Sequence, residues 1–185
     1  MLFRTVRIVK AGIFLMITLT LKEIETPTGV MRLGATEDAL VLCDWPDAPG
    51  APHCLKALCK RLGAVPVTGD SPVLEKAAKA LEEYFAGRLQ TIDLPLRPCG
   101  TPFQESVWKA LLEVPYGKTA SYGDIARRIG RPTAFRAVAQ AVGSNPLCIA
   151  VPCHRIIGSD GSLTGFGGGL DRKVLLLKLE GHNRF

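Results

Sequence analysis

The 185-residue sequence lacks internal repeats and low-complexity tracts, so neither a repeat architecture nor a long disordered segment is expected. It also lacks an apolar run of bilayer length, because the stretch 11–17 is too short to span a membrane. Positive residues before that stretch imitate a secretory signal, but no small-x-small cleavage site follows it. We therefore expect no membrane partner. We interpret residues 1–15 as an extension from an upstream start, with Met16 as an alternative initiator.

The cysteines lack the regular spacing of a disulfide framework, and no Cys-x-x-Cys occurs. Disulfide frameworks belong to small secreted chains, whereas this chain is 47% hydrophobic and can build an ordinary core. His53 and its neighbouring cysteines match no common zinc pattern, so no metal is expected. The sequence favours reduced thiols and a cytoplasmic location. The six cysteines are Cys43, Cys54, Cys59, Cys99, Cys148 and Cys153.

Positive charge is placed unevenly along the chain. Residues 1–100 carry 12 Lys and Arg against 11 Asp and Glu, whereas residues 101–185 carry 11 against 6. An excess in one half suggests a polyanionic partner for that half. A solvated basic surface is the alternative interpretation.

The first half of the chain predicts an α/β domain. Residues 17–22 alternate between apolar and polar, which is typical of a half-buried strand, and 39–45 form a short apolar strand. Residues 47–52 are rich in Pro and Gly and predict a loop. The first clear helix begins at 71–72 with a Ser cap and a Pro, and Gly87 ends it.

The second half predicts nearly all helix. Proline and glycine at 95–100 mark a junction, which divides the chain into domains at 16–97 and 98–185. A capping box at Thr101 begins one helix, and a final helix starts at Asp171. Two short helices, 122–129 and one capped by Thr133 that runs to 142, flank a turn with Gly130. This Arg-rich pair is a helix-turn-helix candidate.

The most informative residues are Cys153 and His154, with Glu180 near the end of the chain. A cysteine becomes a strong nucleophile when its thiolate is stabilised, and an adjacent histidine oriented by a carboxylate is the usual means. Glu180 lies at the end of a predicted helix, where the helix dipole disfavours a carboxylate. Its position therefore favours a role other than helix stabilisation, although an exposed surface acid is the alternative.

The run 145–158, with Asn145-Pro146 before the Pro-Cys-His-Arg core, resembles the active-site segment of the O6-alkylguanine-DNA alkyltransferases, also called methylated-DNA–protein-cysteine methyltransferases, of bacterial type. The resemblance covers about residues 22–182 and is strongest over 100–182. Further segments that carry it are 81–87, 100–104 with Val107-Trp108, Tyr122-Gly123, 136–138, 164–166 and 168–170.

The resemblance implies a fold and an activity. The fold is an α/β N-terminal domain with a small antiparallel, ribonuclease H-like sheet, followed by an all-α C-terminal domain with a winged-helix-like helix-turn-helix. The activity is direct-reversal DNA repair: the alkyl group of O6-alkylguanine, and of O4-alkylthymine, moves irreversibly to a cysteine of the protein. The implied partner is double-stranded alkylated DNA, bound by a monomer without a cofactor.

The resemblance also implies residue roles. Cys153 is the acceptor, His154 takes its proton and Glu180 completes the relay. Asn145 forms a tight turn that holds an active-site strand, Tyr122 helps to rotate the nucleotide and donates a proton to guanine, and Arg136 fills the gap left by the flipped base. The implied further contacts with DNA are Thr133, Ala134 and Ala137, and those with the base are Val151, Phe166 and Gly167.

Two residues depart from the family pattern. Phe135 stands where relatives more often have a small residue, and it either packs inward or alters the groove contact. Gly167 replaces a Ser or Ala, which keeps the backbone amide but predicts a looser loop. Two other functions remain open. One is an alkyltransferase-like module, which would bind damaged DNA without transfer; proteins of that class lack the acceptor cysteine, whereas this chain has Cys153. The other is a Cys-His hydrolase, which would need an oxyanion hole that the sequence does not reveal.

Overall fold

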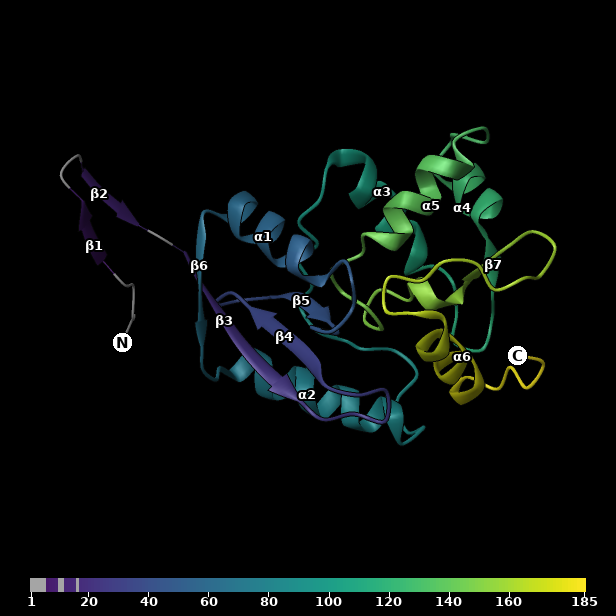
Figure 1. Ribbon diagram of the computed structural model, residues 1–185, viewed down its shortest axis with the longest axis horizontal. Helices are drawn as coiled ribbons and strands as arrows, with labels where there is room; N and C mark the ends of the chain where they lie inside the picture. The colour runs from purple at the N-terminus through teal and green to yellow at the C-terminus, as the bar shows by residue number, and fades with distance from the viewer. Residues whose placement is uncertain (1–5, 10–11, 16) are drawn as a thin grey trace.

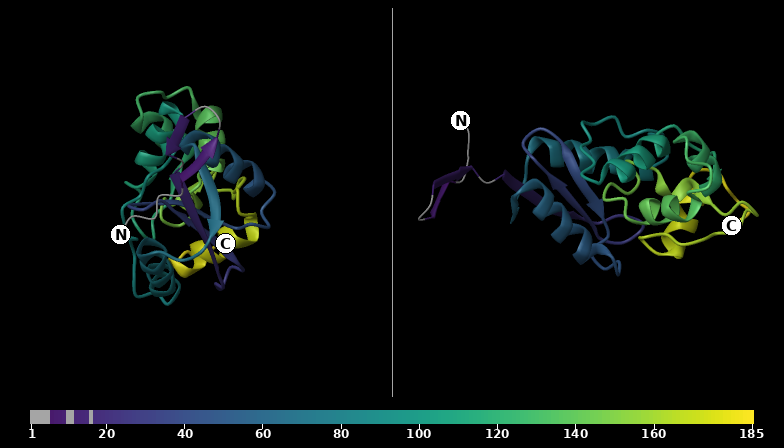
Figure 2. Two further views of the ribbon diagram at one scale, coloured as in Figure 1. Left: turned by 90° about the vertical axis from the view of Figure 1, so that its left-hand side faces the viewer. Right: turned by 90° about the horizontal axis from the view of Figure 1, so that it is seen from above.

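The computed structural model describes residues 6–9, 12–15 and 17–185, with side chains from residue 17 onward. Met16 and residues 1–5 and 10–11 of the proposed extension therefore lie outside the described residues. Two short strands of that extension form an antiparallel hairpin, which lies apart from the rest of the molecule (Figures 1 and 2). These strands are β1 (Val6–Val9) and β2 (Gly12–Leu15).

The N-terminal half contains a four-stranded sheet in the order β5-β4-β3-β6, with helices on both sides (Figure 1). Helix α2 packs against the sheet face that carries Met31 and Leu33, and α1 places Leu58 in the cluster with Leu19 and Leu42 on the other face. The elements are β3 (Ile17–Ile24), β4 (Met31–Ala35), β5 (Leu40–Asp44), α1 (Ala51–Leu62), β6 (Ala64–Thr68) and α2 (Pro72–Phe85).

The sheet is mixed, which corrects the expectation of an antiparallel sheet. Strands β3, β4 and β5 are antiparallel neighbours, but β6 runs parallel to β3, with Ala64 opposite Ile17. After β5, helix α1 carries the chain back to the end of the sheet where β3 begins. Strand β6 therefore runs in the same direction as β3. Pro66 is tolerated in β6 because this strand lies at the edge of the sheet.

Helix α1 was not expected, and it begins inside the predicted loop 47–52. Pro52 lies in its first turn, where a missing backbone N–H costs nothing, and Gly63 ends it in a left-handed conformation. The predicted helix at 71–72 is confirmed: the Ser71 hydroxyl accepts a hydrogen bond from the backbone N–H of Leu74, and Gly87 has φ +72°.

The C-terminal half is mainly helical, as predicted, but not all-α. Two-residue strands β7 and β8 pair in parallel, and residues 144–169 contain only one short 3-10 helix besides β8. Thr101 and Gln104 form the predicted capping box. The elements are α3 (Pro102–Leu111), β7 (Ala120–Ser121), α4 (Tyr122–Arg128), α5 (Phe135–Gly143), the 3-10 helix η1 (Cys153–Arg155), β8 (Ile156–Ile157) and α6 (Leu170–Leu179).

Helices α4 and α5 pack against each other across the turn at Gly130, in the part of the molecule opposite the β1–β2 hairpin (Figure 1). The cap of α5 is Ala134, not Thr133, and no side chain caps this end. The chain between Ile129 and Ala134 turns through backbone hydrogen bonds, so Thr133 is left outside the helix. The final helix begins at Leu170, one residue before the predicted start.

The core is continuous across the predicted junction. One buried cluster contains Met31 and Leu81 from the first half together with Trp108, Val138 and Leu176 from the second. Large buried aromatic and aliphatic side chains contribute most to stability, at roughly 1.5–3 kcal/mol for each aliphatic one. The indole N–H of Trp108 donates to the backbone oxygen of Ala141 at 2.7 Å, so this ring is buried without an unpaired donor.

Candidate active site

The site is held between the two halves of the molecule by strand β5. The backbone N–H of Cys43 donates to the oxygen of Pro146, and the N–H of Cys148 donates to the oxygen of Cys43, at 2.7 and 2.8 Å. The segment after α5 therefore continues the sheet as an extra parallel partner of β5. This pairing fixes the loop that leads to Cys153 against the most buried strand of the N-terminal half.

Asn145 closes this loop. Its side-chain amide donates to the backbone oxygen of Val151 at 2.9 Å, and its side-chain oxygen accepts from the N–H of Leu147 at 3.0 Å. Tight backbone turns follow, and Ile149 has φ +70°, a conformation that branched residues rarely adopt. The expected active-site strand is therefore a chain of turns that ends in η1, and Cys153 is the first residue of that short helix.

The thiol of Cys153 is buried and surrounded by groups that stabilise its charged form. The Asn145 amide donates to its Sγ at 3.1 Å. The neighbouring Cys148 thiol, the hydrogen bond from Asn145 and the positive charge of Lys173 together outweigh burial and lower the pKa of Cys153. Hydrogen bonding to Cys153 and burial raise the pKa of Cys148, so the neighbouring thiol stays protonated. The thiolate character is therefore concentrated on one of the two cysteines.

His154 and Glu180 form a buried pair. The Nε2 of His154 lies 2.8 Å from the Oε1 of Glu180, and both side chains are inaccessible to solvent. Burial lowers the pKa of His154, so the resting imidazole is neutral. Burial alone would raise the pKa of Glu180, but hydrogen bonds from His154 and Arg155 outweigh it and lower that pKa to about 2.

The hydrogen bonds around Glu180 fix the imidazole tautomer. The carboxylate accepts from the Tyr84 hydroxyl at 2.8 Å, from Arg155 at 2.9 Å and from the N–H of Gly117 at 3.2 Å. An ionised carboxylate only accepts, so His154 must donate from Nε2. The Nδ1 atom of the neutral ring then carries a lone pair. It is buried and has no hydrogen-bond partner within the described residues, so it is available as a proton acceptor.

Two residues of the site carry no sequence signal. Tyr84 reads as one position of an apolar helical stripe, yet its hydroxyl reaches Glu180 from α2. Lys173 reads as a polar residue of α6, yet it is fully buried, and burial lowers its pKa to about 8. Its ammonium donates to the backbone oxygens of Ile156 and Thr164, so it ties the loop after β8 to the site. Arg155, by contrast, lies inside the recognised run.

The loop 164–168 contacts Tyr122, Trp45 and Lys173. The Tyr122 hydroxyl donates to the oxygen of Gly165 at 3.3 Å and lies 3.2 Å from the hydroxyl of Thr164. The Phe166 ring meets Trp45 edge-on, with centroids 5.8 Å apart. A cavity of about 490 Å³ opens here. Its lining consists of Tyr122, Ala139, Gly143 and residues 164–167.

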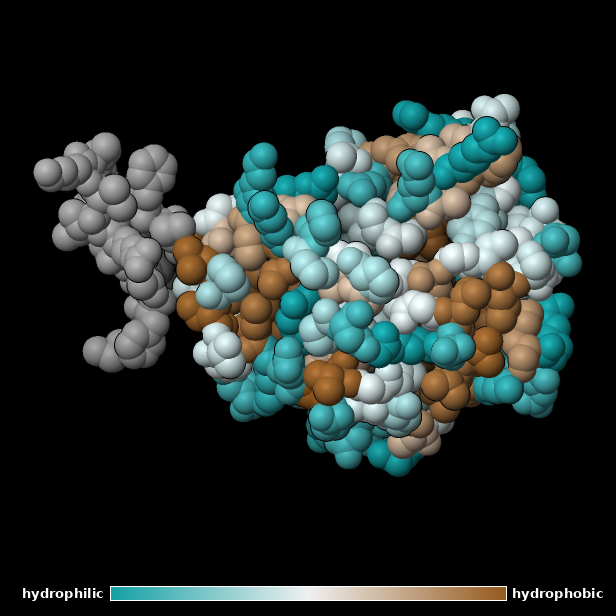
Figure 3. Space-filling model, viewed as in Figure 1, coloured by the Kyte–Doolittle hydropathy of each residue, from teal (hydrophilic) through white to brown (hydrophobic). Residues whose placement is uncertain are grey.

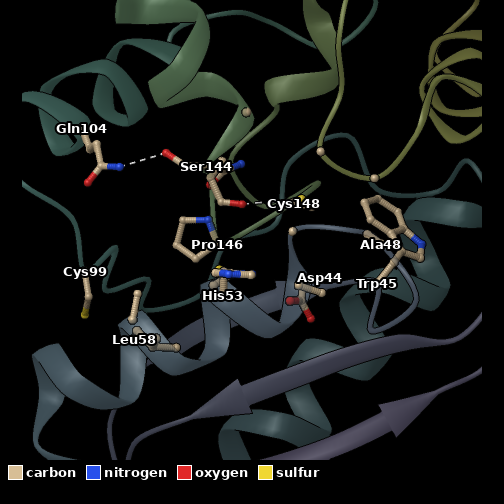
Figure 4. A pocket seen from close by; sticks show the side chains of 18 of the residues that line it. Asp44, Trp45, Ala48, His53, Leu58, Cys99, Gln104, Ser144, Pro146 and Cys148 are labelled. Atoms are coloured by element: carbon tan, nitrogen blue, oxygen red, sulfur yellow. Dashed lines mark hydrogen bonds between the residues drawn. The ribbon is translucent and has the colours of Figure 1, made fainter.

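Gly167 is required by a close approach. A Cβ added there would lie 2.8 Å from the backbone oxygen of Gly143, so any side chain would force the loop away from α5. The expectation of a looser loop therefore misses this packing role. Residues 143 and 167 also border a second cavity of about 310 Å³, between α1 and the segment 143–148 (Figure 4). In that view Pro146 lies next to His53 of α1, and the Gln104 amide donates to the Ser144 hydroxyl.

The remaining predicted residues fall into two places. Val151 is buried beneath the loop, and its oxygen already accepts hydrogen bonds from Asn145 and from the N–H of Cys153. The predicted DNA contacts lie instead on the outside, where Thr133, Arg136 and Ala137 are exposed and Ala134 is partly buried. The structure thus brings Cys153, Asn145, His154 and Glu180 together. Tyr122 instead lines the cavity beside α5, and Cys153 is not among the residues that line it.

Fold and site together show a buried cysteine with a lowered pKa and a buried histidine–glutamate pair, in the half of the chain that also contains the packed helices α4 and α5. A family model described as 6-O-methylguanine DNA methyltransferase, DNA binding domain, matches residues 102–182. The chain belongs to the methylated-DNA–protein-cysteine methyltransferase family.

Relatives that carry that name support the assignment. The protein of Methanosarcina barkeri is 58% identical over 108 residues, which cover 58% of this chain and 68% of the relative. The protein of Methanosarcina mazei is 47% identical over 139 residues, which cover 74% of this chain and 88% of the relative.

Solved structures are similar over most of the chain. The O6-methylguanine methyltransferase of Mycobacterium tuberculosis is 42% identical, with a TM-score of 0.74, over 92% of this chain and 95% of that one. The complex of Mycobacterium tuberculosis OGT with DNA is 42% identical, also with a TM-score of 0.74, over 88% and 92%. In the part of the chain that the structure describes, no helix is long and apolar enough to cross a membrane.

Proposed function

We propose that this chain repairs DNA by direct reversal and transfers the alkyl group of O6-alkylguanine, and of O4-alkylthymine, to the sulfur of Cys153. The family membership supports this activity. The observation that carries it is the environment of the Cys153 thiol, whose pKa is lowered while the thiol stays enclosed. A thiolate protected from water reacts with an alkyl carbon rather than with solvent.

The reaction begins with a proton transfer inside the site. The thiol proton of Cys153 passes to Nδ1 of His154 through a water molecule, and the resulting imidazolium is stabilised by Glu180. The Sγ then attacks the alkyl carbon, so that a sulfur–carbon bond forms while the bond from carbon to O6 breaks. The electron pair goes to the guanine, which receives a proton from Tyr122. The thioether product is stable, so each molecule acts once.

The flipped base occupies the cavity beside Tyr122. This cavity lies between α5 and the loop 164–167, which gives it one helical wall and one wall of backbone groups. The Phe166 ring offers a stacking surface, and the amide of Gly167 faces the base oxygen. The oxygen of Val151 has two other hydrogen bonds, so its part is to position the turn beneath the base.

The exposed start of α5 contacts the DNA. Arg136 enters the gap that the flipped base leaves, because a base inside a duplex is out of reach of any nucleophile. Ala134 and Ala137 allow close approach to the minor groove, and Thr133 contacts the backbone. This arrangement rests on the exposure of these residues and on the basic charge of the second half.

Finer features of the protein are part of the same proposal. The N-terminal domain, residues 16–97, is ribonuclease H-like, and the C-terminal domain, residues 98–185, presents a winged-helix-like helix-turn-helix to double-stranded alkylated DNA. The protein acts as a monomer in the cytoplasm, without a cofactor, because the reactivity of the alkyl group itself drives the transfer.

Mass spectrometry after incubation with an O6-methylguanine duplex tests the function. We expect a mass gain of one methyl group per chain, located on Cys153, and none in a Cys153→Ser variant that keeps Cys148. Binding of the damaged duplex without a mass gain would instead indicate an alkyltransferase-like module. Turnover of esters or peptides would indicate a hydrolase. A gain on Cys148 would show that the acceptor is misassigned.

A further inference from the structure

Phe135 is an aromatic side chain that does not pack into the protein. Half of it is exposed, at 50%, and it is the only exposed aromatic residue within residues 17–185. It is the first residue of α5, and it is absent from the residues that pack against the core cluster. The ring is therefore open to solvent at the start of α5, whose place in the fold is seen in Figure 1.

The residues around Phe135 leave its ring uncovered. The cap Ala134 and the exposed Ala137 carry only a methyl group, so neither side chain covers the ring. The guanidinium of Arg136 lies 5.8 Å from the centroid of the Phe135 ring, within the range of a cation–π contact. Such a contact holds the arginine and the ring together as one unit at the start of the helix.

The surroundings of this ring are basic. The exposed arginines on α4, on the turn and on α5 outnumber the nearby acidic residues. Two of these acids already have a partner: Asp124 pairs with Arg127, and Glu113 lies 4.0 Å from Arg128. Helix α5 itself carries no acidic residue. In the space-filling view this corner shows hydrophilic side chains beside apolar ones (Figure 3). A basic surface selects a polyanion rather than an apolar protein partner. The exposed arginines are Arg127, Arg128, Arg131 and Arg136.

We propose that Phe135 is an apolar wedge that enters the base stack of duplex DNA beside the lesion while Arg136 enters the gap left by the flipped base. The proposal rests on the proposed function. Proteins that dock in the minor groove insert apolar side chains, phenylalanine among them, between base steps and thereby kink the duplex. The exposed ring is buried only when it meets the bases, so its contribution appears in the DNA complex and not in the free protein.

The wedge explains why a bulky residue stands at the approach to the groove. The ring separates two base pairs, and this separation weakens the stacking that holds the target nucleotide in the helix. The arginine beside it then needs less energy to occupy the vacated space. Phe135 is therefore a specificity residue for duplex substrates, and it has no role in the chemistry at Cys153.

Two measurements test the wedge in the full chain. The first compares the rate of methyl transfer from an O6-methylguanine duplex with the rate from the free alkylguanine base. The second follows the fluorescence of a 2-aminopurine placed next to the lesion, which rises when the base is unstacked, in a Cys153→Ser background that prevents transfer. The variants are Phe135→Ala and, as matched control, Leu112→Ala, because Leu112 is exposed to a similar extent, 51%, at the end of α3.

We expect Phe135→Ala to slow transfer from the duplex roughly ten-fold, as loss of one unstacking contact would, to reduce the fluorescence rise, and to react normally with the free base. Leu112→Ala should match the unchanged protein on both substrates. Equal rates for Phe135→Ala and the unchanged protein on the duplex would overturn the wedge but leave the proposed function intact. An equal loss on the duplex and the free base would also overturn it, since the ring would then support the fold.

Two further results would have a different meaning. If the unchanged protein transfers no methyl group from either substrate, the proposed function fails, and the wedge fails with it. If Phe135→Ala changes only the sedimentation of the protein, the ring belongs to a contact between copies of this chain, and the wedge is overturned.

Discussion

Asn145 donates its side-chain N–H to the Sγ of Cys153 across 3.1 Å, and the same amide group holds the oxygen of Val151. One residue thus shapes the turn and stabilises the thiolate. Because the side-chain oxygen also accepts from Leu147, every polar atom of this buried side chain has a partner. The loop and the reactivity of the nucleophile therefore depend on the same side chain.

Replacement of Asn145 should affect stability and reactivity together. Asn145→Ala leaves the N–H of Leu147 without its partner and removes a donor to the thiolate, so we expect a loss of about 1–3 kcal/mol in the free energy of unfolding. The pKa of Cys153 should rise. Thermal unfolding and the pH profile of Cys153 alkylation measure the two effects. Ser144→Ala, next in the chain, serves as control, and an unchanged pH profile in Asn145→Ala would contradict the thiolate role.

Glu180 should lower the effective pKa of Cys153 by stabilising protonated His154. A charge-assisted hydrogen bond contributes roughly 1.5–3 kcal/mol, which corresponds to about one to two pKa units. Glu180→Gln keeps the shape and removes the charge, so alkylation should slow and its pH profile should move upward. Asp171→Asn removes an exposed acid from the same helix and should change neither. Reaction of Glu180→Gln with free alkylguanine at the wild-type rate across pH 6 to 9 would refute the relay.

The pKa of Glu180 also predicts how stability depends on pH. Its folded pKa of about 2 lies below the ordinary value of 4.5, so the carboxylate stabilises the fold above pH 4.5. That contribution is lost as the pH falls from 4.5 through 2. Denaturant titrations at several pH values should show this loss in the wild type and not in Glu180→Gln. If the free energy of unfolding falls equally in the two proteins as the pH is lowered, Glu180 is not an ionised, hydrogen-bonded group.

Cys148 should assist the nucleophile as a hydrogen-bond donor. Its thiol lies near both the backbone oxygen of Asn145, at 3.7 Å, and the sulfur of Cys153, whose pKa it lowers. Cys148→Ala should raise the pKa of Cys153 and slow its alkylation near neutral pH, whereas Cys148→Ser keeps a donor and should react more nearly as the wild type. Stopped-flow alkylation across pH distinguishes them. Coincident pH profiles for the Ala variant and the wild type would rule out this assistance.

The sequence predicted the elements with strong local signals. Helix α2 begins at a side-chain cap with a following proline, and α3 carries a capping box, so both starts were read correctly. Helix α1 was missed because Pro49, Gly50 and Pro52 around its start favour a loop. Leucines at helical spacing later in that helix were the available signal. Strand β6 was missed because only tertiary pairing with β3 makes its short, proline-containing segment a strand.

The residues of the site likewise differ in whether the local sequence reveals them. Cys153, His154 and Glu180 were singled out because their residue types suit one reaction. Tyr84 and Lys173 could not be found, because a helix position tells which face a side chain occupies and not which distant group it meets. Tyr84 reaches Glu180 across 96 residues of sequence. Such contacts arise from packing between α2, η1 and α6, which no local pattern encodes.

Arg136 should contribute mainly to base extrusion. A phosphate-contacting arginine, when lost, weakens binding to all DNA and reduces the salt slope by about one unit. An extrusion arginine instead speeds transfer from the duplex and leaves the free base unaffected. We therefore expect Arg136→Ala to be slow on a lesion duplex only. Arg131→Ala, which removes the same charge from the preceding turn, should show the phosphate pattern. Equal losses of Arg136→Ala on both substrates would contradict extrusion.

Methylation of Cys153 should destabilise the protein through Lys173. Burial lowers the pKa of Lys173 to about 8, which means that the charged ammonium is less stable in the folded than in the unfolded protein. This charge therefore lowers the free energy of unfolding. The loss is full below pH 8 and disappears as the pH rises from 8 towards the unfolded pKa of 10.5. The Cys153 thiolate partly offsets the loss, because its charge raises the pKa of Lys173. A methyl group on the sulfur removes that charge, so the loss at neutral pH increases.

The methylated protein should therefore unfold at a lower temperature than the unmodified protein at pH 7, and the gap should narrow at pH 9.5, where Lys173 is mostly neutral in both. Differential scanning calorimetry of the two forms at each pH measures the gap. Lys173→Met removes the titrating group, so its gap should no longer depend on pH. Lys178→Met, which changes an exposed lysine of the same helix, should behave as the wild type. A gap that is equal at both pH values in the wild type would show that the methyl group acts by its volume alone and not through the charge of Lys173.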